Sequence, residues 1–250
     1  MPLVPSYIKK LERYKPGKSV QLAKSESNDE RVDYIKLSSN ENPLGSSPVA
    51  IAALKKTYDN LNRYPDASGI GLRKKLSQNF NVEIDNVVIG SGSEGIMSTI
   101  MRTFLLNDDE IIGAAGSFIG FRVLANASGR KVHWVPMKDY HYDLGLMAKK
   151  ISDYTKIIYI ANPDNPMGTY IKKAEFDQFY ANVPDRVLII LDEAYYEFAK
   201  LQKDYPDSMH YRYDNVITLR TFSKAYGLGG LRIGYGFAHK DLIQNKIHLS

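Results

Sequence analysis

The chain has 250 residues, of which 44% are hydrophobic and 24% are charged. These fractions are typical of globular proteins and exclude a disordered chain, and the length allows one large domain or two small ones. No stretch approaches the roughly 20 apolar residues that cross a bilayer, and the first 24 residues lack the apolar core of a secretory signal. The absence of cysteine excludes disulfide scaffolds, thiolate metal sites and cysteine nucleophiles. We therefore expect a cytoplasmic protein with no membrane partner and no metal in its site.

Lysine and arginine outnumber aspartate and glutamate by 33 to 28, which gives a net charge of +5. Such an excess suits an anionic partner, either nucleic acid or a phosphorylated small molecule. The basic residues are scattered, and pairs such as Lys55-Lys56 and Lys149-Lys150 lie on segments that read as amphipathic helices. The sequence has no ladder of arginine and aromatic residues of the kind that binds single strands. Nucleic acid is therefore the weaker hypothesis, and we expect no nucleic-acid partner.

The first third of the chain predicts an arm followed by two helices. Residues 1 to about 35 are polar and irregular, which indicates an arm rather than a core element. Ser47 and Pro48 favour a helix start, with serine as the N-cap and proline in the first turn, and apolar residues follow at helical spacing as far as Leu61. The Arg-Tyr-Pro-Asp sequence at 63–66 ends this helix, and a second helix is expected at 69–80.

From residue 87 onward, short apolar runs alternate with helical patterns. The runs expected as strands lie at 87–89, 110–114, 131–137, 156–161, 187–191, 215–219 and 233–238. One helix is expected through Ile96, Ile100 and Phe104, and others at 118–128, 143–151, 172–183 and 241–250. Continuous apolar strands that alternate with helices indicate a largely parallel sheet covered on both faces. The predicted fold class is therefore α/β, with three layers in the order α-β-α.

Two turns rich in glycine and proline follow strands in this pattern. The first, Gly-Ser-Gly-Ser-Glu-Gly at 90–95, opens a helix whose free backbone N–H groups favour an anion such as phosphate. Its spacing differs from the dinucleotide fingerprint and no Walker lysine follows, so a tight turn without a ligand remains the alternative. The second, Asn-Pro-Asp-Asn-Pro-Met-Gly at 162–168, lies at the carboxyl end of a strand, where open α/β sheets bind ligands. Its asparagine amide is either a ligand contact or part of a plain turn.

Two further motifs carry ionisable side chains. Asp192 and Glu193 end a buried strand, where charges need a cationic partner or hydrogen bonds unless a surface loop gives them water. Lys224 lies among small and apolar residues, beside two hydroxyls, in a glycine-rich turn. Desolvation favours its neutral amine, which a Schiff-base lysine requires. Arg232, eight residues later, suits bidentate binding of a phosphate.

Six motifs in their order along the chain resemble the fold-type I pyridoxal-phosphate (PLP) aminotransferases, and within them the histidinol-phosphate aminotransferase group. The resemblance covers the chain from about residue 5 to its end. The motifs are Asn-Glu-Asn-Pro at 40–43, Arg-Tyr-Pro at 63–65, the turn at 90–95, Asn-Pro-x-Asn-Pro-x-Gly at 162–168, Asp-Glu-Ala-Tyr at 192–195 and Ser-Lys-x-x-x-Leu-x-Gly-Leu-Arg at 223–232. The fold implied by this resemblance is that of the PLP-transferase large domain.

The resemblance implies PLP as the cofactor and three catalytic residues. Lys224 matches the lysine that forms a Schiff base with PLP and later moves the substrate α-proton. Asp192 matches the carboxylate that pairs with the pyridine nitrogen and holds it protonated, so that the ring accepts electrons. Tyr195, together with Asn165, matches the residues that hydrogen-bond the phenolic oxygen of the cofactor.

The resemblance also implies how the rest of the cofactor is held. Phe118 matches an aromatic ring that stacks on the pyridine, and Asn42 and Tyr14 match segments on the substrate side. Tyr64 matches a tyrosine that reaches the cofactor phosphate of the neighbouring subunit, which implies a homodimer. The phosphate itself is expected to contact the backbone N–H groups of Ser93 and Glu94. The side chains of Thr221, Ser223 and Arg232 are expected to complete its binding site.

The sequence departs from the family pattern in two side chains and in length. Met167 stands where threonine is usual, and Glu94 where aspartate is common. In the family, a C-terminal small domain supplies the arginine for the substrate α-carboxylate, and that arginine cannot be located in this sequence. We therefore expect an N-terminal arm or small-domain segment at 1–45, a PLP-binding large domain at 46–240, and at 241–250 the start of a helix that leads to a small domain largely absent from this chain. On this expectation, the 250 residues alone bind PLP weakly and transaminate little.

The reaction implied is a ping-pong exchange of an amino group between a small amine or amino acid and 2-oxoglutarate. L-Histidinol phosphate is the first candidate for the amino donor. An aromatic aminotransferase and a threonine-phosphate decarboxylase share the same cofactor motifs, so these motifs do not choose among the three. A protein that binds PLP without catalysis is the remaining alternative.

Overall fold

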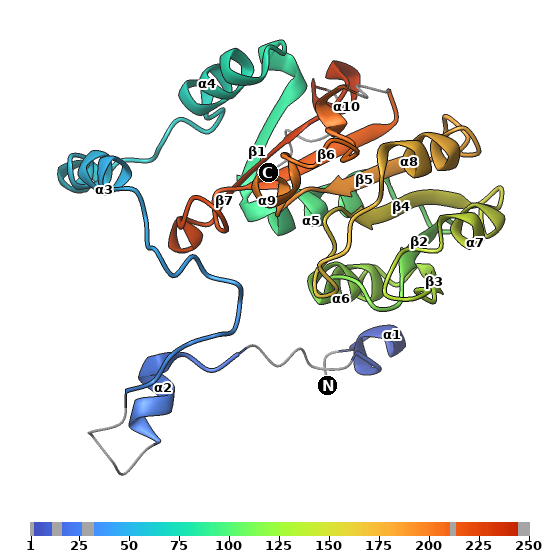
Figure 1. Cartoon of the computed structure of the whole chain (residues 1–250), viewed down its shortest axis with the longest axis horizontal. Helices are drawn as coiled ribbons and strands as arrows, with labels where there is room; N and C mark the ends of the chain where they lie inside the picture. Colours follow the sequence, from blue (N-terminus) through green and yellow to red (C-terminus); the bar gives the residue numbers. More distant parts are fainter. Residues whose placement is uncertain (1–2, 12–16, 27–32, 211–213, 245–250) are drawn as a thin grey trace.

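The computed structural model describes residues 3–11, 17–26, 33–210 and 214–244, and these residues contain one mixed sheet between layers of helices (Figure 1). All the strands expected from the apolar runs are present. Their order across the sheet is β1-β7-β6-β5-β4-β2-β3. Their bounds are β1 Val87–Ser91, β2 Glu110–Ala114, β3 Lys131–Val135, β4 Thr155–Ala161, β5 Leu188–Asp192, β6 Val216–Thr221 and β7 Ile233–Phe237.

The sheet is mostly parallel. Strands β3, β2, β4, β5 and β6 run parallel to one another, whereas β7 pairs antiparallel with both β6 and β1. Because β7 alone is reversed, the carboxyl ends of the other strands lie at one edge of the sheet. Ligands of open α/β sheets bind at that edge.

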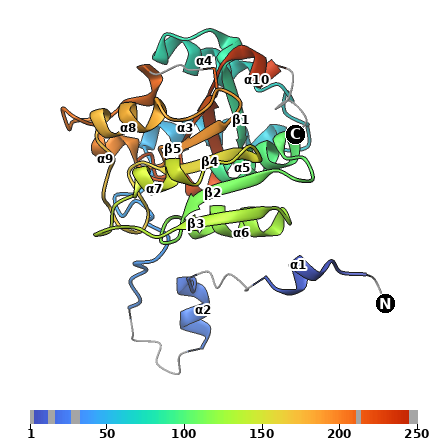
Figure 2. The same cartoon turned by 90° about the vertical axis from the view of Figure 1, so that its right-hand side faces the viewer.

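Helices cover both faces, as the continuous apolar strands predict (Figure 2). The helices α5 (Gly92–Phe104), α6 (Ile119–Ala127) and α10 (Lys240–Gln244) pack on one face through Ile100, Phe121 and Ile243. The other face is covered by α4 (Ile70–Phe80), α7 (Leu144–Lys149) and α8 (Lys173–Tyr180). The fold class is therefore a three-layer α-β-α sandwich, as the sequence predicted.

Alternation along β6 decides which side chains reach the face under α5. Ile217 and Leu219 belong to the core on that face, whereas Val216 packs into the opposite core. Because successive side chains of a strand point to opposite faces, Thr221 shares the α5 face and Arg220 does not. The same alternation of side chains along β5 places Asp192, at the end of that strand, on the α5 face.

The arm at the N-terminus is more structured than its polar sequence indicated. It contains the short helices α1 (Ser6–Lys9) and α2 (Val20–Ser25), and none of their residues is buried. The interpretation of this segment as irregular was therefore wrong for these two helices, which lack the apolar periodicity that marks a packed helix. Ser19 caps α2 with its hydroxyl, which accepts a hydrogen bond from the Leu22 N–H at 3.1 Å.

The helix expected from Ser47 to Leu61 is shorter in the structure. Helix α3 spans Pro48–Lys55, a 3₁₀ turn follows at Tyr58–Asn60, and α3 has no buried residue. An apolar stripe extends a helix only where it packs on a core, and here it does not. Figure 1 shows α2 and α3 projecting from the body of the sheet.

The remaining elements are short. They are the helix α9 (Tyr196–Ala199) and the 3₁₀ turns at Ile84–Asn86, Ser208–His210 and Gly229–Leu231. The helix expected from residue 241 begins at Lys240, and its part after Gln244 lies outside the described residues. Along the residues described, no helix combines the length and the apolar character needed to cross a membrane.

A buried carboxylate joins the amino ends of β2, β3 and β4. Glu110 accepts hydrogen bonds from Lys131 Nζ at 2.7 Å and Ser152 Oγ at 2.9 Å, and its other contact is His133 Nε2 at 2.8 Å. The Lys131 contact, more than the other hydrogen bonds, lowers the pKa of Glu110 to about 2, although burial opposes it. An ionised Glu110 therefore favours the folded state.

We expect Glu110→Gln to destabilise the fold by about 1–2 kcal/mol at neutral pH, since a hydrogen-bonded charge is lost and exposed Lys131 is screened by solvent. The folded pKa lies below the ordinary value, so this stability is present above about pH 4.5 and is lost as the pH falls toward 2. Thermal melts of both proteins from pH 7 to pH 2.5 test this. A difference in Tm that is constant over that range would contradict it.

Candidate active site

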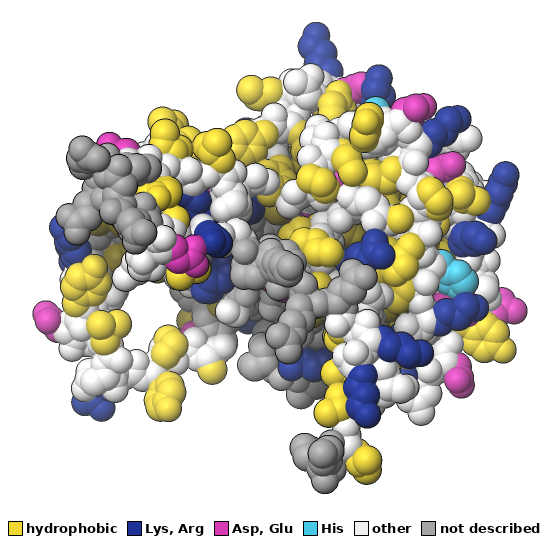
Figure 3. All heavy atoms as spheres, turned by 90° about the horizontal axis from the view of Figure 1, so that it is seen from below, with side chains coloured by type: hydrophobic (Ala, Val, Ile, Leu, Met, Phe, Trp, Pro, Cys, Tyr) yellow, Lys and Arg dark blue, Asp and Glu magenta, His cyan; other side chains and the backbone are white. Residues whose placement is uncertain are grey.

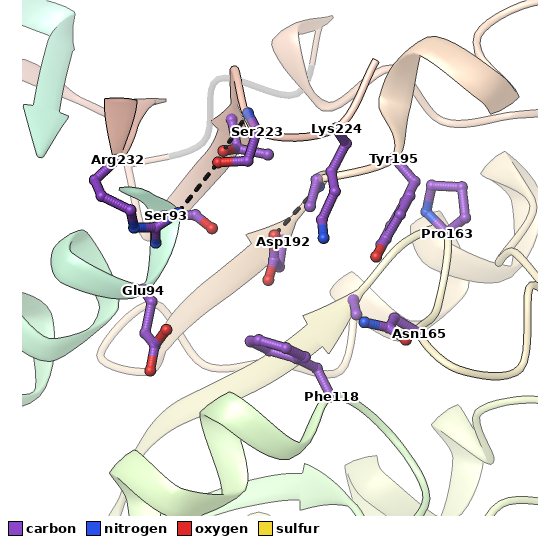
Figure 4. A pocket seen from close by; sticks show the side chains of 13 residues that line it. Ser93, Glu94, Phe118, Pro163, Asn165, Asp192, Tyr195, Ser223, Lys224 and Arg232 are labelled. Atoms are coloured by element: carbon purple, nitrogen blue, oxygen red, sulfur yellow. Dashed lines mark hydrogen bonds between the residues drawn. The ribbon is translucent and has the colours of Figure 1, made fainter. Parts of the chain in front are cut away.

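A pocket opens at the carboxyl edge of the sheet, where β4, β5 and β6 end beside the start of α5 (Figure 4). Its volume of about 160 Å³ suits an organic molecule rather than a bound water, which needs roughly 15 Å³. The pocket brings together residues that lie far apart in the sequence. It is lined by Ser93, Glu94, Phe118, Ala161, Pro163, Asn165, Asp192, Ala194, Tyr195, Thr221, Ser223, Lys224 and Arg232.

One end of the pocket is built for an anion. Ser93 and Glu94 form the first turn of α5, whose N-terminus has no side-chain cap and therefore presents free backbone N–H groups. Arg232 lies at the same end, and its Nη1 donates to Ser223 Oγ at 3.4 Å. The Ser223 N–H in turn donates to Thr221 Oγ1 at 3.1 Å. A helix dipole, a guanidinium and two hydroxyls thus converge on one place.

Two glycines make this anion-binding end possible. Gly92 has a φ of +75°, and a Cβ there would lie 2.7 Å from Arg232 Nη2. A Cβ at Gly234 would lie 2.3 Å from the Ser93 nitrogen, so β7 runs directly against the start of α5. The glycines allow a backbone conformation and a contact that side chains would prevent.

Lys224 lies at the centre of the pocket, half-buried after β6. Burial lowers the pKa of its amine, Arg232 lowers it further, and Asp192 opposes both. Its Nζ donates a hydrogen bond to the Ser39 carbonyl at 2.7 Å. The lowered pKa makes the nucleophilic neutral amine accessible, as the apolar sequence around this lysine predicted.

The turn that carries Lys224 is held by the segment at 39–46. The Asn42 amide donates to the Ala225 carbonyl at 2.9 Å, and Ser46 Oγ donates to the Gly227 carbonyl at 2.6 Å. These two hydrogen bonds fix the backbone that directly follows Lys224.

Asp192 is buried at the end of β5 and faces Lys224 (Figure 4). Burial raises its pKa to about 6, although hydrogen bonds and the nearby amine oppose the shift. Tyr159 Oη donates to Oδ2 at 2.9 Å, and the Ala194 N–H donates to Oδ1 at 3.2 Å. At neutral pH the carboxylate is therefore largely ionised and available to a cationic ring nitrogen.

Tyr195 and Asn165 lie at the end of the pocket opposite Arg232, and Phe118 forms one wall (Figure 4). Burial is the largest of the effects that raise the pKa of Tyr195, so its hydroxyl stays protonated at neutral pH. The Asn40 amide donates to that hydroxyl at 2.8 Å. The Tyr195 hydroxyl can therefore donate its own proton to a ligand oxygen.

Two of the expected site residues do not line the pocket, and a third lies outside the described residues. Tyr64 is fully exposed, on the segment at 35–64 that projects from the sheet. Its role at a neighbouring subunit stays a prediction. Asn42 is engaged with the lysine turn rather than lining the cavity, and its substrate role likewise stays a prediction. Tyr14 lies outside the described residues.

The partner of Glu193 is a residue that sequence reasoning did not identify. Arg220 Nε donates to Glu193 Oε2 at 2.9 Å, and Arg220 Nη2 donates to Asp207 Oδ1 at 3.0 Å. The side chains of Arg220 and Glu193 are each only 1% exposed. The expectation that a charge ending a buried strand needs a cationic partner is met for Glu193. Removing either partner of such a buried pair costs about 3–5 kcal/mol.

A second unforeseen residue is Asp164, which joins two walls of the pocket. Its Oδ1 accepts hydrogen bonds from Ser117 Oγ at 2.5 Å and Tyr142 Oη at 3.2 Å. Ser117 precedes Phe118 and Asp164 precedes Asn165, so these bonds tie the aromatic wall to the asparagine turn. The only sequence signal for Asp164 was its place within the 162–168 motif.

A pocket with a buried carboxylate, a half-buried amine of lowered pKa and an uncapped helix N-terminus suits an anionic ligand with a reactive carbonyl. Residues 32–249 match the family described as aminotransferase class I and II, and the chain belongs to this family.

Two curated relatives match almost the whole chain. Histidinol-phosphate aminotransferase 2 of Carboxydothermus hydrogenoformans is 39% identical and covers 96% of the chain. Histidinol-phosphate aminotransferase of an Anaeromyxobacter species is 40% identical and covers 98% of it. The chain spans about two thirds of the length of these relatives, 66% and 67% respectively.

The fold is also similar to a solved structure of histidinol-phosphate aminotransferase from Sinorhizobium meliloti in complex with pyridoxal-5'-phosphate. The TM-score is 0.76 at 29% sequence identity, over 83% of this chain and 57% of the solved one. The family and the fold class expected from the sequence motifs are thereby confirmed.

Proposed function

We propose that this chain is a PLP-dependent aminotransferase that exchanges an amino group between L-histidinol phosphate and 2-oxoglutarate. The observation that carries the proposal is the convergence of Lys224, Asp192 and the uncapped start of α5 on one pocket. The likeness to histidinol-phosphate aminotransferases over nearly the whole chain supports the same function.

The residues of the pocket fit PLP at each of its polar groups. The start of α5 with Arg232, Thr221 and Ser223 would hold the phosphate. Asp192 would face the ring nitrogen, and Phe118 would lie against the ring. When bound, PLP supplies a ring that withdraws electrons from the substrate α-carbon.

The remaining chemistry belongs to the side chains of this chain. Lys224 in its neutral form would supply the amine that condenses with the cofactor carbonyl, with loss of water. Once the substrate amine has taken its place, the free Lys224 amine would move a proton to or from the substrate α-carbon. Tyr195 and Asn165 would hold the phenolic oxygen of the cofactor. Asp192 stabilises positive charge on the ring nitrogen as long as it is ionised, that is, above about pH 6.

The proposal is tested with PLP and three amino donors. In the longest natural form that contains this chain, the protein is expected to gain visible absorbance with PLP and to aminate 2-oxoglutarate fastest from histidinol phosphate. Phenylalanine and phosphothreonine are the comparison donors. Faster turnover of phenylalanine would indicate an aromatic aminotransferase, and release of CO₂ from phosphothreonine a decarboxylase. Absorbance without turnover of any donor would indicate a protein that binds PLP without catalysis.

We also propose that the chain forms a homodimer through the projecting segment at 35–64. Hydrophobic side chains are exposed on this part of the molecule (Figure 3). The exposed fractions of Leu37, Val49 and Tyr64 are 88%, 79% and 101%. Exposed apolar surface of this kind is typical of an interface. A second copy that covers it would bring Tyr64 to the neighbouring site, as the family resemblance implies.

The double variant Leu37→Glu/Val49→Glu is expected to shift the chain from dimer to monomer, because two buried charges would replace apolar contacts at the interface. Sedimentation velocity of both proteins measures this. Tyr154→Glu is the control, since Tyr154 is also exposed but lies before β4, outside this segment. A wild-type monomer at micromolar concentration would contradict the dimer.

Two further expectations belong to this proposal. We propose that residues 46–240 form the PLP-binding large domain and 1–45 the arm that borders its site. We also propose a cytoplasmic location, since a chain without cysteine suits a reducing compartment.

A further inference from the structure

Tyr159 lies directly beneath the pocket without lining it. Its hydroxyl donates a hydrogen bond to Asp192 Oδ2 at 2.9 Å, from the neighbouring strand β4. The other carboxylate oxygen, Oδ1, accepts from the Ala194 N–H at 3.2 Å. Each oxygen of Asp192 therefore has one donor from the protein, and Tyr159 is the one supplied by a side chain.

Tyr159 is held rigidly in this position. It is 1% exposed, and its ring stacks on Phe121 of α6 with 3.8 Å between the ring centroids and 8° between the planes. Burial, with the nearby charge of Asp192, raises the pKa of Tyr159 well above its ordinary value. The hydroxyl therefore remains protonated, and able to donate, at neutral pH.

We propose that Tyr159 is a positioning residue, whose hydroxyl fixes the rotamer of Asp192 and aims the carboxylate at the cofactor ring nitrogen. This inference rests on the proposed PLP function. A buried carboxylate with a single backbone donor can rotate about its last torsion, whereas two donors on two oxygens fix its plane.

The same hydrogen bond keeps Asp192 ionised. The charged and titratable groups that face Asp192 are Tyr159 from β4, Asp164 from the turn after β4, Lys224 from the turn after β6 and Tyr195 from the segment after β5. Burial and Asp164 raise the pKa of Asp192, whereas the Tyr159 hydroxyl, the Ala194 N–H and Lys224 lower it. Removal of the hydroxyl therefore moves the pKa of Asp192 upward from about 6, toward neutral pH.

The test compares Tyr159→Phe with Tyr235→Phe. Tyr235 on β7 is also 1% exposed, so the second variant removes the hydroxyl of an equally buried tyrosine away from Asp192. The turnover number kcat, KM and the visible absorbance of bound PLP are measured from pH 5 to pH 8, together with PLP affinity by equilibrium dialysis and Tm. For Tyr159→Phe, we expect the acid limb of kcat and of the absorbance, the decline below about pH 6, to move up by about one pH unit, as loss of a hydrogen bond to a charge implies. We also expect kcat to fall about tenfold, with a smaller change in KM.

Tyr235→Phe is expected to change Tm and leave the acid limb in place. An acid limb that does not move in Tyr159→Phe, or that moves equally in both variants, would overturn the positioning role. A wild-type chain that binds no PLP at any pH would instead overturn the proposed function, and this inference with it.

Discussion

Replacing Lys224 with alanine is expected to abolish the visible absorbance of the PLP complex and to lower turnover by at least 10²–10⁴-fold. The change removes a nucleophile and a proton carrier together, because one amine performs both roles. The pocket supports both, since burial and Arg232 lower the pKa of this amine. Absorbance spectra and turnover with histidinol phosphate measure the two losses.

Two further variants make the Lys224 result specific. Lys224→Arg keeps the positive charge and the hydrogen-bonding capacity toward the Ser39 carbonyl, but a guanidinium does not lose its proton. It is expected to be as inactive as the alanine variant. Lys173→Ala removes an exposed lysine of α8 and is expected to leave both measurements unchanged. Wild-type turnover in Lys224→Ala would show that another residue is the nucleophile.

Much of the fold could be predicted because the strands are buried on both faces. Runs such as 156–161 and 187–191 are apolar throughout, and β4 and β5 cover nearly the same residues. The reversed direction of β7 was not predicted, because the direction of a strand depends on the path of the chain around it. Arg220 was missed for a related reason, since its partner Glu193 directly follows β5, a different strand from the one that carries Arg220.

Much of the pocket could be predicted because its residues sit in short motifs at strand ends. The asparagine turn and the lysine turn are each local, and parallel strands bring such turns to the same edge. Contacts across the fold could not be predicted in this way. Asn40 reaches Tyr195, and Ser39 accepts from Lys224, only because the arm returns to the sheet edge. Tyr159 looked like an ordinary β-strand residue, and only its register with β5 places it against Asp192.

Replacing Asp192 with alanine is expected to lower turnover far more than it lowers the affinity for PLP. The anion-binding end, with Ser93, Arg232 and Ser223, does not depend on Asp192 and should still hold the phosphate. Without the carboxylate, the ring nitrogen has no buried negative charge to keep it protonated, so the ring stabilises negative charge on the substrate poorly. A loss on the order of 10²–10³-fold in kcat is expected for such an electrostatic contact.

Asp192→Asn separates charge from shape in the same experiment. The amide keeps the size of the side chain, its oxygen can still accept from the Ala194 N–H, and its NH₂ can donate to the Tyr159 hydroxyl oxygen, but it carries no charge at any pH. If the charge is what matters, Asp192→Asn loses kcat as Asp192→Ala does, and the wild-type decline in kcat below about pH 6 disappears with it. Parallel measurements of kcat, PLP affinity and Tm decide between the two roles. Equal losses of affinity and turnover, accompanied by a lower Tm, would mean that Asp192 supports the end of β5 rather than the chemistry of the ring.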